Sequence, residues 1–105
     1  MIDWDRVREL RQEIGLEAFE EVIDLFLEEV EAGLEAIRDD MSTVERAERL
    51  HFLAGCALNL GFIVFAELCQ SVERGLCGAH AEEIRACYDR SRAEFLADIG
   101  KAMAA

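Results

Sequence analysis

Residues 16–38 read LEAFEEVIDLFLEEVEAGLEAIR, and this stretch decides the fold class. Apolar side chains return every three or four positions along it, the spacing that places them on one face of an α-helix. They form a predicted buried stripe of Phe19, Val22, Ile23, Phe26, Val30, Leu34 and Ile37. The glutamates between them predict an opposite face that is exposed to solvent. The stretch therefore predicts a long amphipathic helix that packs against other helices.

The sequence on either side predicts more helices. Upstream, Asp3 is a suitable N-cap for a short helix that ends at Gly15. Downstream, Ser42-Thr43-Val44-Glu45 is a capping-box sequence, which opens a helix that breaks near Gly61. The chain contains no proline, so nothing interrupts the backbone hydrogen bonds inside these segments.

Two further helices are predicted over residues 62–74 and 80–103, with a turn at Gly75–Gly78 between them. Connections this short make consecutive helices antiparallel neighbours. The expected fold class is therefore all-α, an antiparallel up-down four-helix bundle with a short N-terminal helix. We expect one domain over residues 1–105.

The charge balance excludes several classes of partner. The formal net charge is -12, and a field of that sign repels the phosphates of nucleic acid and of anionic membranes. Residues 50–66 carry no formal charge, but they contain His51 and Asn59, so a buried segment is favoured over a membrane span. The first residues lack the apolar run of a signal peptide, and we expect a cytoplasmic protein.

The cysteines do not have the spacing of a zinc or redox motif. They are expected to be free thiols that pack as small apolar groups, at Cys56, Cys69, Cys77 and Cys87.

His51 stands apart from the core side of its predicted helix. At about 100° per residue, Leu53, Ala57 and Leu60 fall on one side of Leu50 and define the buried stripe. His51 falls about 100° away on the other side, at the edge of that stripe. The imidazole is therefore expected to be open to solvent, where neutral histidine is a competent nucleophile.

The neighbours of His51 one helical turn away are Ala47 and Glu48 before it and Ala54 and Gly55 after it. The three small residues, Ala47, Ala54 and Gly55, predict a low surface around the ring. A glycine inside a helix costs about 0.5–1 kcal/mol relative to alanine, and Gly55 clears space for an approaching molecule. Spacing alone leaves a second interpretation open, in which His51 is an ordinary surface residue and Gly55 a helix-packing contact.

Residues 51–61, HFLAGCALNLG, resemble the signature of histidine-containing phosphotransfer (HPt) domains, His-x-Leu-Lys-Gly-x-Ala-x-Asn-Leu-Gly. The matching positions are His51, Leu53, Gly55, Ala57, Asn59, Leu60 and Gly61. Residues 68–73 also look like the next helix of that family. The resemblance implies that His51 accepts a phosphoryl group from a receiver domain's aspartyl phosphate and returns it to another receiver.

By this resemblance the partners are a response-regulator receiver domain and a hybrid sensor histidine kinase. Gly55 is implied as the clearance position, and Asn59 and Gly61 are implied to shape the helix end. The receiver supplies the magnesium and the reacting aspartate, so no cofactor is expected on this chain.

The family's lysine, three residues after the histidine, is Ala54 here. A cation there would help to hold the phosphoryl oxygens, and Arg46 and Arg49 lie on another side of the helix. The first functional hypothesis is a phosphorelay intermediate. The second is a pseudo-HPt adaptor that binds a receiver or kinase without phosphotransfer. A purely structural helical module is the third.

Four residues around His51 are candidate docking positions. Phe52 and Leu58 would form an apolar patch for a receiver helix, flanked by Glu48 and Ala47. The alternative is that Phe52 folds against a neighbouring helix.

Glu48 and His51 also have the Glu-x-x-His spacing of di-iron bundles, but such a site needs a second copy. Cys77 occupies the equivalent position before His80, so no metal site is expected.

Overall fold

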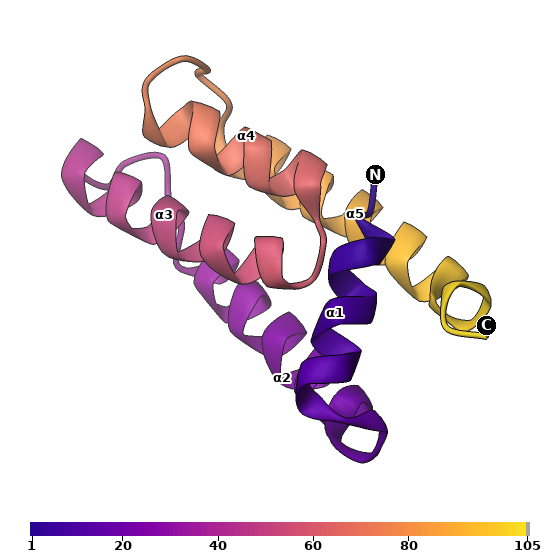
Figure 1. Ribbon diagram of the computed structural model, residues 1–105. Coiled ribbons are helices and arrows are strands. Elements are labelled where there is room, and N and C mark those ends of the chain that lie inside the picture. The colour runs from indigo at the N-terminus through magenta and orange to yellow at the C-terminus, as the bar shows by residue number, and fades with distance from the viewer. Residues whose placement is uncertain (105) are drawn as a thin grey trace.

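The computed structural model describes residues 1–104, which form five helices and no strand (Figure 1). The helices are α1 (Trp4–Ile14), α2 (Leu16–Glu35), α3 (Thr43–Asn59), α4 (Ile63–Glu73) and α5 (Ala81–Ala102). From α2 to α5 each helix packs antiparallel to the next, and α1 leans across α2 and the end of α3 (Figure 1). The predicted all-α bundle with a leading helix is confirmed.

The predicted helix starts are confirmed by their capping hydrogen bonds. The backbone N–H of Arg6 donates to the Asp3 carboxylate at 3.3 Å, and that of Glu45 donates to the Ser42 hydroxyl at 3.2 Å. Each cap satisfies a donor that the first turn of a helix leaves without a partner. Gly15 separates α1 from α2 with φ +95°, a backbone conformation that glycine adopts at low cost.

The second helix ends at Glu35, three residues before the end that its apolar pattern predicts. Arg85 of α5 explains the difference, because its guanidinium donates to the carbonyl oxygens of Leu34 and Ile37 at 3.0 and 2.6 Å. In a longer helix these carbonyl oxygens would accept hydrogen bonds from backbone N–H groups of the next turn, and Arg85 replaces those donors. A residue distant in sequence therefore sets this boundary.

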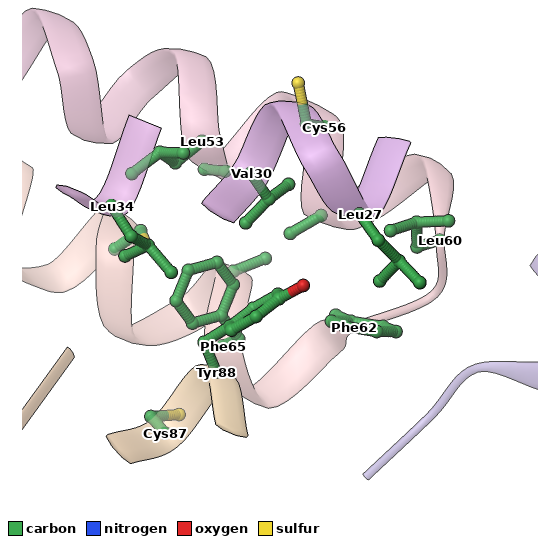
Figure 2. Packing of buried hydrophobic residues seen from close by; sticks show 14 of the residues in the cluster. Leu27, Val30, Leu34, Leu53, Cys56, Leu60, Phe62, Phe65, Cys87 and Tyr88 are labelled. Atoms are coloured by element: carbon green, nitrogen blue, oxygen red, sulfur yellow. The ribbon is translucent and has the colours of Figure 1, made fainter. Parts of the chain in front are cut away.

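The core lies between α2, α3, α4 and α5. Figure 2 shows the rings of Phe65 and Tyr88 below the α2 side chains of Leu27, Val30 and Leu34. The two ring centroids are 5.5 Å apart in an edge-to-face arrangement, a favourable geometry for aromatic pairs. Burial raises the pKa of the Tyr88 hydroxyl, as does its 2.7 Å hydrogen bond to the Glu31 carboxylate.

The buried stripe of α2 differs from the predicted one at three positions. Leu27 is buried, whereas Val22 and Phe26 are only half-buried. The four cysteines are free thiols, as predicted. Burial raises the pKa of the Cys69 thiol to about 12, so this residue behaves as a small apolar group.

The uncharged run 50–66 is divided between α3 and α4 by a tight turn. Gly61 lies in that turn with φ +73°, and its carbonyl oxygen accepts the backbone N–H of Asp3 at 2.7 Å. Arg6 of α1 also donates to the side-chain oxygen of Asn59 at 3.1 Å. The start of α1 is therefore fixed to the end of α3. Within residues 1–104, no helix is long and apolar enough to cross a membrane.

Candidate functional site

The imidazole of His51 lies on the surface of α3, and its side chain is 79% exposed. Its Nδ1 lies 3.0 Å from an Oε1 atom of Glu73, a 25% exposed side chain near the end of α4. An ionised carboxylate only accepts hydrogen bonds, so Nδ1 is the donor in this contact. The lone pair of the neutral ring then lies on Nε2, for which no described residue provides a hydrogen-bond partner.

The packing of α3 against α4 brings these two side chains together. The two helices are in contact, and both bury small residues, Ala54 and Ala57 on α3 and Ala66 on α4. Small side chains let two helices approach closely along their length. The tight turn at Gly61 then fixes the register, so that Glu73 lies beside His51. The contact is therefore a consequence of the hairpin between the two helices.

An open hollow of about 450 Å³ lies next to the imidazole. Its lining consists of Thr43, Val44, Ala47, Glu48, His51 and Glu73. Val44 is 70% exposed and contributes apolar surface to one end of the hollow. Two of the lining residues are carboxylates, and none is lysine or arginine. An incoming group therefore meets a nucleophilic ring beside negative charge.

The small residues around His51 have different positions in the structure. Gly55 is exposed, and a Cβ added there would meet no described atom within 4 Å. Ala47 is half-buried and lines the hollow. Ala54, expected to contribute to the low surface, is instead buried and only 3% exposed. Its side chain packs between helices, so the low surface beside the ring comes from Ala47 and Gly55.

The candidate docking residues line two surface features: Phe52 and Glu48 line one groove, and Ala47 and Glu48 line the hollow beside His51. Phe52 is 54% exposed, but it lines a groove between α2 and α3, where it lies near Gly33. Leu58 is 43% exposed and lies seven residues after His51, which places it on the same side of α3. Val44 lies seven residues before His51, so Val44, His51 and Leu58 form one stripe along the helix.

Sequence reasoning missed Glu73 as the partner of the imidazole. Glu48 is exposed and makes no hydrogen bond or ion pair with any residue in the range 1–104. A usable signal was the hairpin register, because His51 lies ten residues before Gly61 and Glu73 twelve residues after it. Two antiparallel helices that meet at a tight turn place such positions side by side.

The arginines near the site are held elsewhere. A terminal nitrogen of Arg46 donates to the Ala79 carbonyl oxygen at 2.7 Å and lies 3.7 Å from the Asp39 carboxylate. Arg49 pairs with Glu45 at 3.9 Å along the same helix. The described residues also contain no cluster of three or more His, Cys, Asp or Glu side chains that could hold a metal ion.

Comparison with known proteins identifies the family. The family model described as Hpt domain matches residues 21–94, which is more than half of the chain. The matched segment contains His51, Glu73 and the whole hollow between them. No curated protein and no solved structure matched the chain. From the family match, together with a helical bundle of the expected kind, this chain belongs to the Hpt domain family.

Proposed function

We propose that this chain is a phosphorelay intermediate with His51 as its phosphoacceptor. The donor is a receiver domain attached to a hybrid sensor histidine kinase, and the recipient is the receiver domain of a response regulator. One observation carries the proposal: an exposed imidazole is held through Nδ1 by Glu73, and its Nε2 has no partner in the described chain. Membership of the Hpt domain family supports a role in phosphorelay.

The transfer step is a displacement at phosphorus. The Nε2 lone pair of neutral His51 attacks the phosphorus of the receiver's aspartyl phosphate, forming a nitrogen–phosphorus bond. The bond from phosphorus to the aspartyl oxygen breaks, and its electron pair leaves with the aspartate carboxylate. The ring keeps its Nδ1 proton and becomes a phosphoimidazolium, whose positive charge faces the Glu73 carboxylate. Return of the group to another receiver reverses each bond change.

The protein's contribution to this step is to position the nucleophile. The receiver supplies the magnesium ion and the leaving group, so the reaction needs an imidazole in fixed orientation and an open approach. The hydrogen bond to Glu73 fixes the orientation of the imidazole. The open space at Gly55 and the exposed apolar side chains of Val44 and Leu58 provide the open approach for the receiver.

The second candidate function is an adaptor that binds a receiver or kinase without phosphotransfer. The observation that favours it is Ala54, a buried side chain in place of the family's lysine. An adaptor would use the same stripe of Val44 and Leu58 for binding, with no chemistry at His51.

One labelling experiment separates the two functions. The protein is incubated with a receiver domain carrying a radioactive aspartyl phosphate, in the presence of magnesium, and the label is then located by peptide mapping. We expect a phosphate that is stable in alkali, labile in acid and confined to the peptide that contains His51. A receiver that binds, measured by calorimetry, and transfers no label would contradict the relay and support the adaptor.

The contribution of Glu73 to the rate of phosphoryl transfer can be tested by substitution. Glu73→Ala removes the hydrogen bond to Nδ1, and we expect transfer to slow by roughly tenfold, the equivalent of about 1.4 kcal/mol. Glu73→Gln keeps an acceptor for the Nδ1 proton and should retain more of the rate. Rapid-quench measurement of label transfer provides the rates.

Glu67→Ala is the matched control, because Glu67 is an exposed glutamate of α4 outside the hollow. Its transfer rate should equal that of the unmodified protein. Equal rates for Glu73→Ala and Glu67→Ala would show that the contact does not orient the imidazole.

A further inference from the structure

We propose that Glu48 biases phosphoryl flow toward the receiver, because its carboxylate raises the free energy of phosphorylated His51. The transfer equilibrium would then shift toward the phosphorylated receiver, which favours passing the group on over storing it. This inference rests on the proposed function, since it assumes that His51 is the phosphoacceptor. It adds a role for a residue that makes no contribution to the transfer step itself.

The position of Glu48 relative to His51 carries the inference. Glu48 lies three residues before His51 on α3, a spacing at which side chains are neighbours on the helix surface, with Cβ atoms about 5–6 Å apart. Both residues line the same hollow. Glu48 is exposed and has no hydrogen-bond or ion-pair partner within residues 1–104, so its carboxylate is not held by a cation.

None of the surrounding arginines in the described chain forms an ion pair with this carboxylate. Arg46 lies in the neighbouring hollow, where its guanidinium is held by the Ala79 carbonyl oxygen. Arg49 lines the groove between α2 and α3 together with Glu48 and Phe52, but its guanidinium pairs with Glu45 at 3.9 Å and forms no ion pair with Glu48. Arg74 is exposed at the end of α4, and it does not line the hollow beside His51. The described lining therefore contains two carboxylates and no arginine or lysine.

The two carboxylates act differently on phosphorylated His51. Glu73 faces Nδ1, so its attraction to the positive charge that the ring gains on phosphorylation compensates for its repulsion of the phosphoryl group. Glu48 has no contact with the ring nitrogen and meets the phosphoryl oxygens only through repulsion. The repulsion is absent when His51 is unmodified and neutral. Glu48 therefore raises the free energy of one side of the transfer equilibrium.

The test measures the equilibrium ratio of phosphorylated chain to phosphorylated receiver, after both directions of transfer have been allowed to balance. Glu48→Gln removes the negative charge, and we expect the ratio to rise roughly threefold. Glu48→Lys reverses the charge and should raise the ratio by about tenfold. The matched control is Glu28→Gln, an exposed glutamate of α2 that loses the same charge away from the hollow.

The outcomes distinguish the inference from its alternatives. Forward and reverse rates that change by the same factor, with a constant ratio, would show that Glu48 only contacts the receiver and would overturn the inference. A ratio that rises equally in Glu28→Gln would also overturn it, because net charge would then suffice. Complete absence of label in the unmodified protein would instead overturn the proposed function, and the inference with it.

Discussion

Replacing His51 with glutamine is expected to abolish phosphoryl transfer while the protein stays folded. The only nitrogen nucleophile in the hollow is the imidazole, since the other lining side chains are carboxylate, hydroxyl or apolar groups. An amide nitrogen has no available lone pair for attack on phosphorus. We therefore expect the label to fall below detection in the assay with a phosphorylated receiver.

The fold should tolerate this change because His51 contributes little to packing. Its side chain is 79% exposed and makes one hydrogen bond within the described chain, the contact with Glu73. Glutamine has an N–H donor that can serve the same carboxylate. The free energy of unfolding should change by less than about 0.5 kcal/mol, the usual range for surface substitutions. Urea unfolding followed by circular dichroism measures it.

His80→Gln is the matched control for this prediction. His80 is the other histidine of the chain, and its side chain is 71% exposed at the start of α5. This variant should accept the label at the rate of the unmodified protein. Label that persists in His51→Gln and disappears in His80→Gln would make His80 the phosphoacceptor and contradict the proposed site.

The features that local sequence predicts are those with local physical causes. The caps at Asp3 and Ser42 depend on a side chain and a backbone N–H three residues apart. The alternation of apolar and acidic residues in 16–38 likewise depends on the repeat of a single helix. Such signals are complete within one or two helical turns, and this is why the number and order of helices could be predicted.

The features that sequence did not predict depend on contacts between distant segments. Glu73 becomes the partner of His51 only through the register of α3 against α4. The end of α2 is set by Arg85, which lies some fifty residues downstream. Ala54 is buried in the core of the bundle, and a wheel drawn for α3 alone cannot show which of its faces the neighbouring helices cover. In each case the missing information was which helix face meets which neighbour.

Replacing Gly61 with alanine is expected to destabilise the protein by about 3 kcal/mol, out of the 5–15 kcal/mol typical of a domain. Gly61 has φ +73°, a left-handed conformation that costs other residues roughly 1–2 kcal/mol. A Cβ at this position would also lie 2.5 Å from the backbone oxygen of Asp3. The segment before α1 would have to move, which would weaken the 2.7 Å hydrogen bond between Asp3 and Gly61.

Gly75→Ala separates the two causes of this loss. Gly75 has φ +75°, nearly the same backbone conformation, but an added Cβ there would meet no described atom within 4 Å. Its substitution should cost only the backbone strain, roughly 1–2 kcal/mol, when both variants are unfolded in urea. The difference between the two losses then measures the clash with Asp3. Equal losses would show that the start of α1 yields freely and contributes little to stability.

The same variant connects the turn to the chemistry of the site. Gly61 belongs to the turn that sets the register of α3 and α4, and that register brings Glu73 within 3.0 Å of His51. If Gly61→Ala shifts the register, phosphoryl transfer should slow as it does in Glu73→Ala, even at temperatures where the variant is fully folded. If only the start of α1 moves, stability falls while the transfer rate is retained. Because α1 contributes no side chain to the hollow beside His51, we expect the second result.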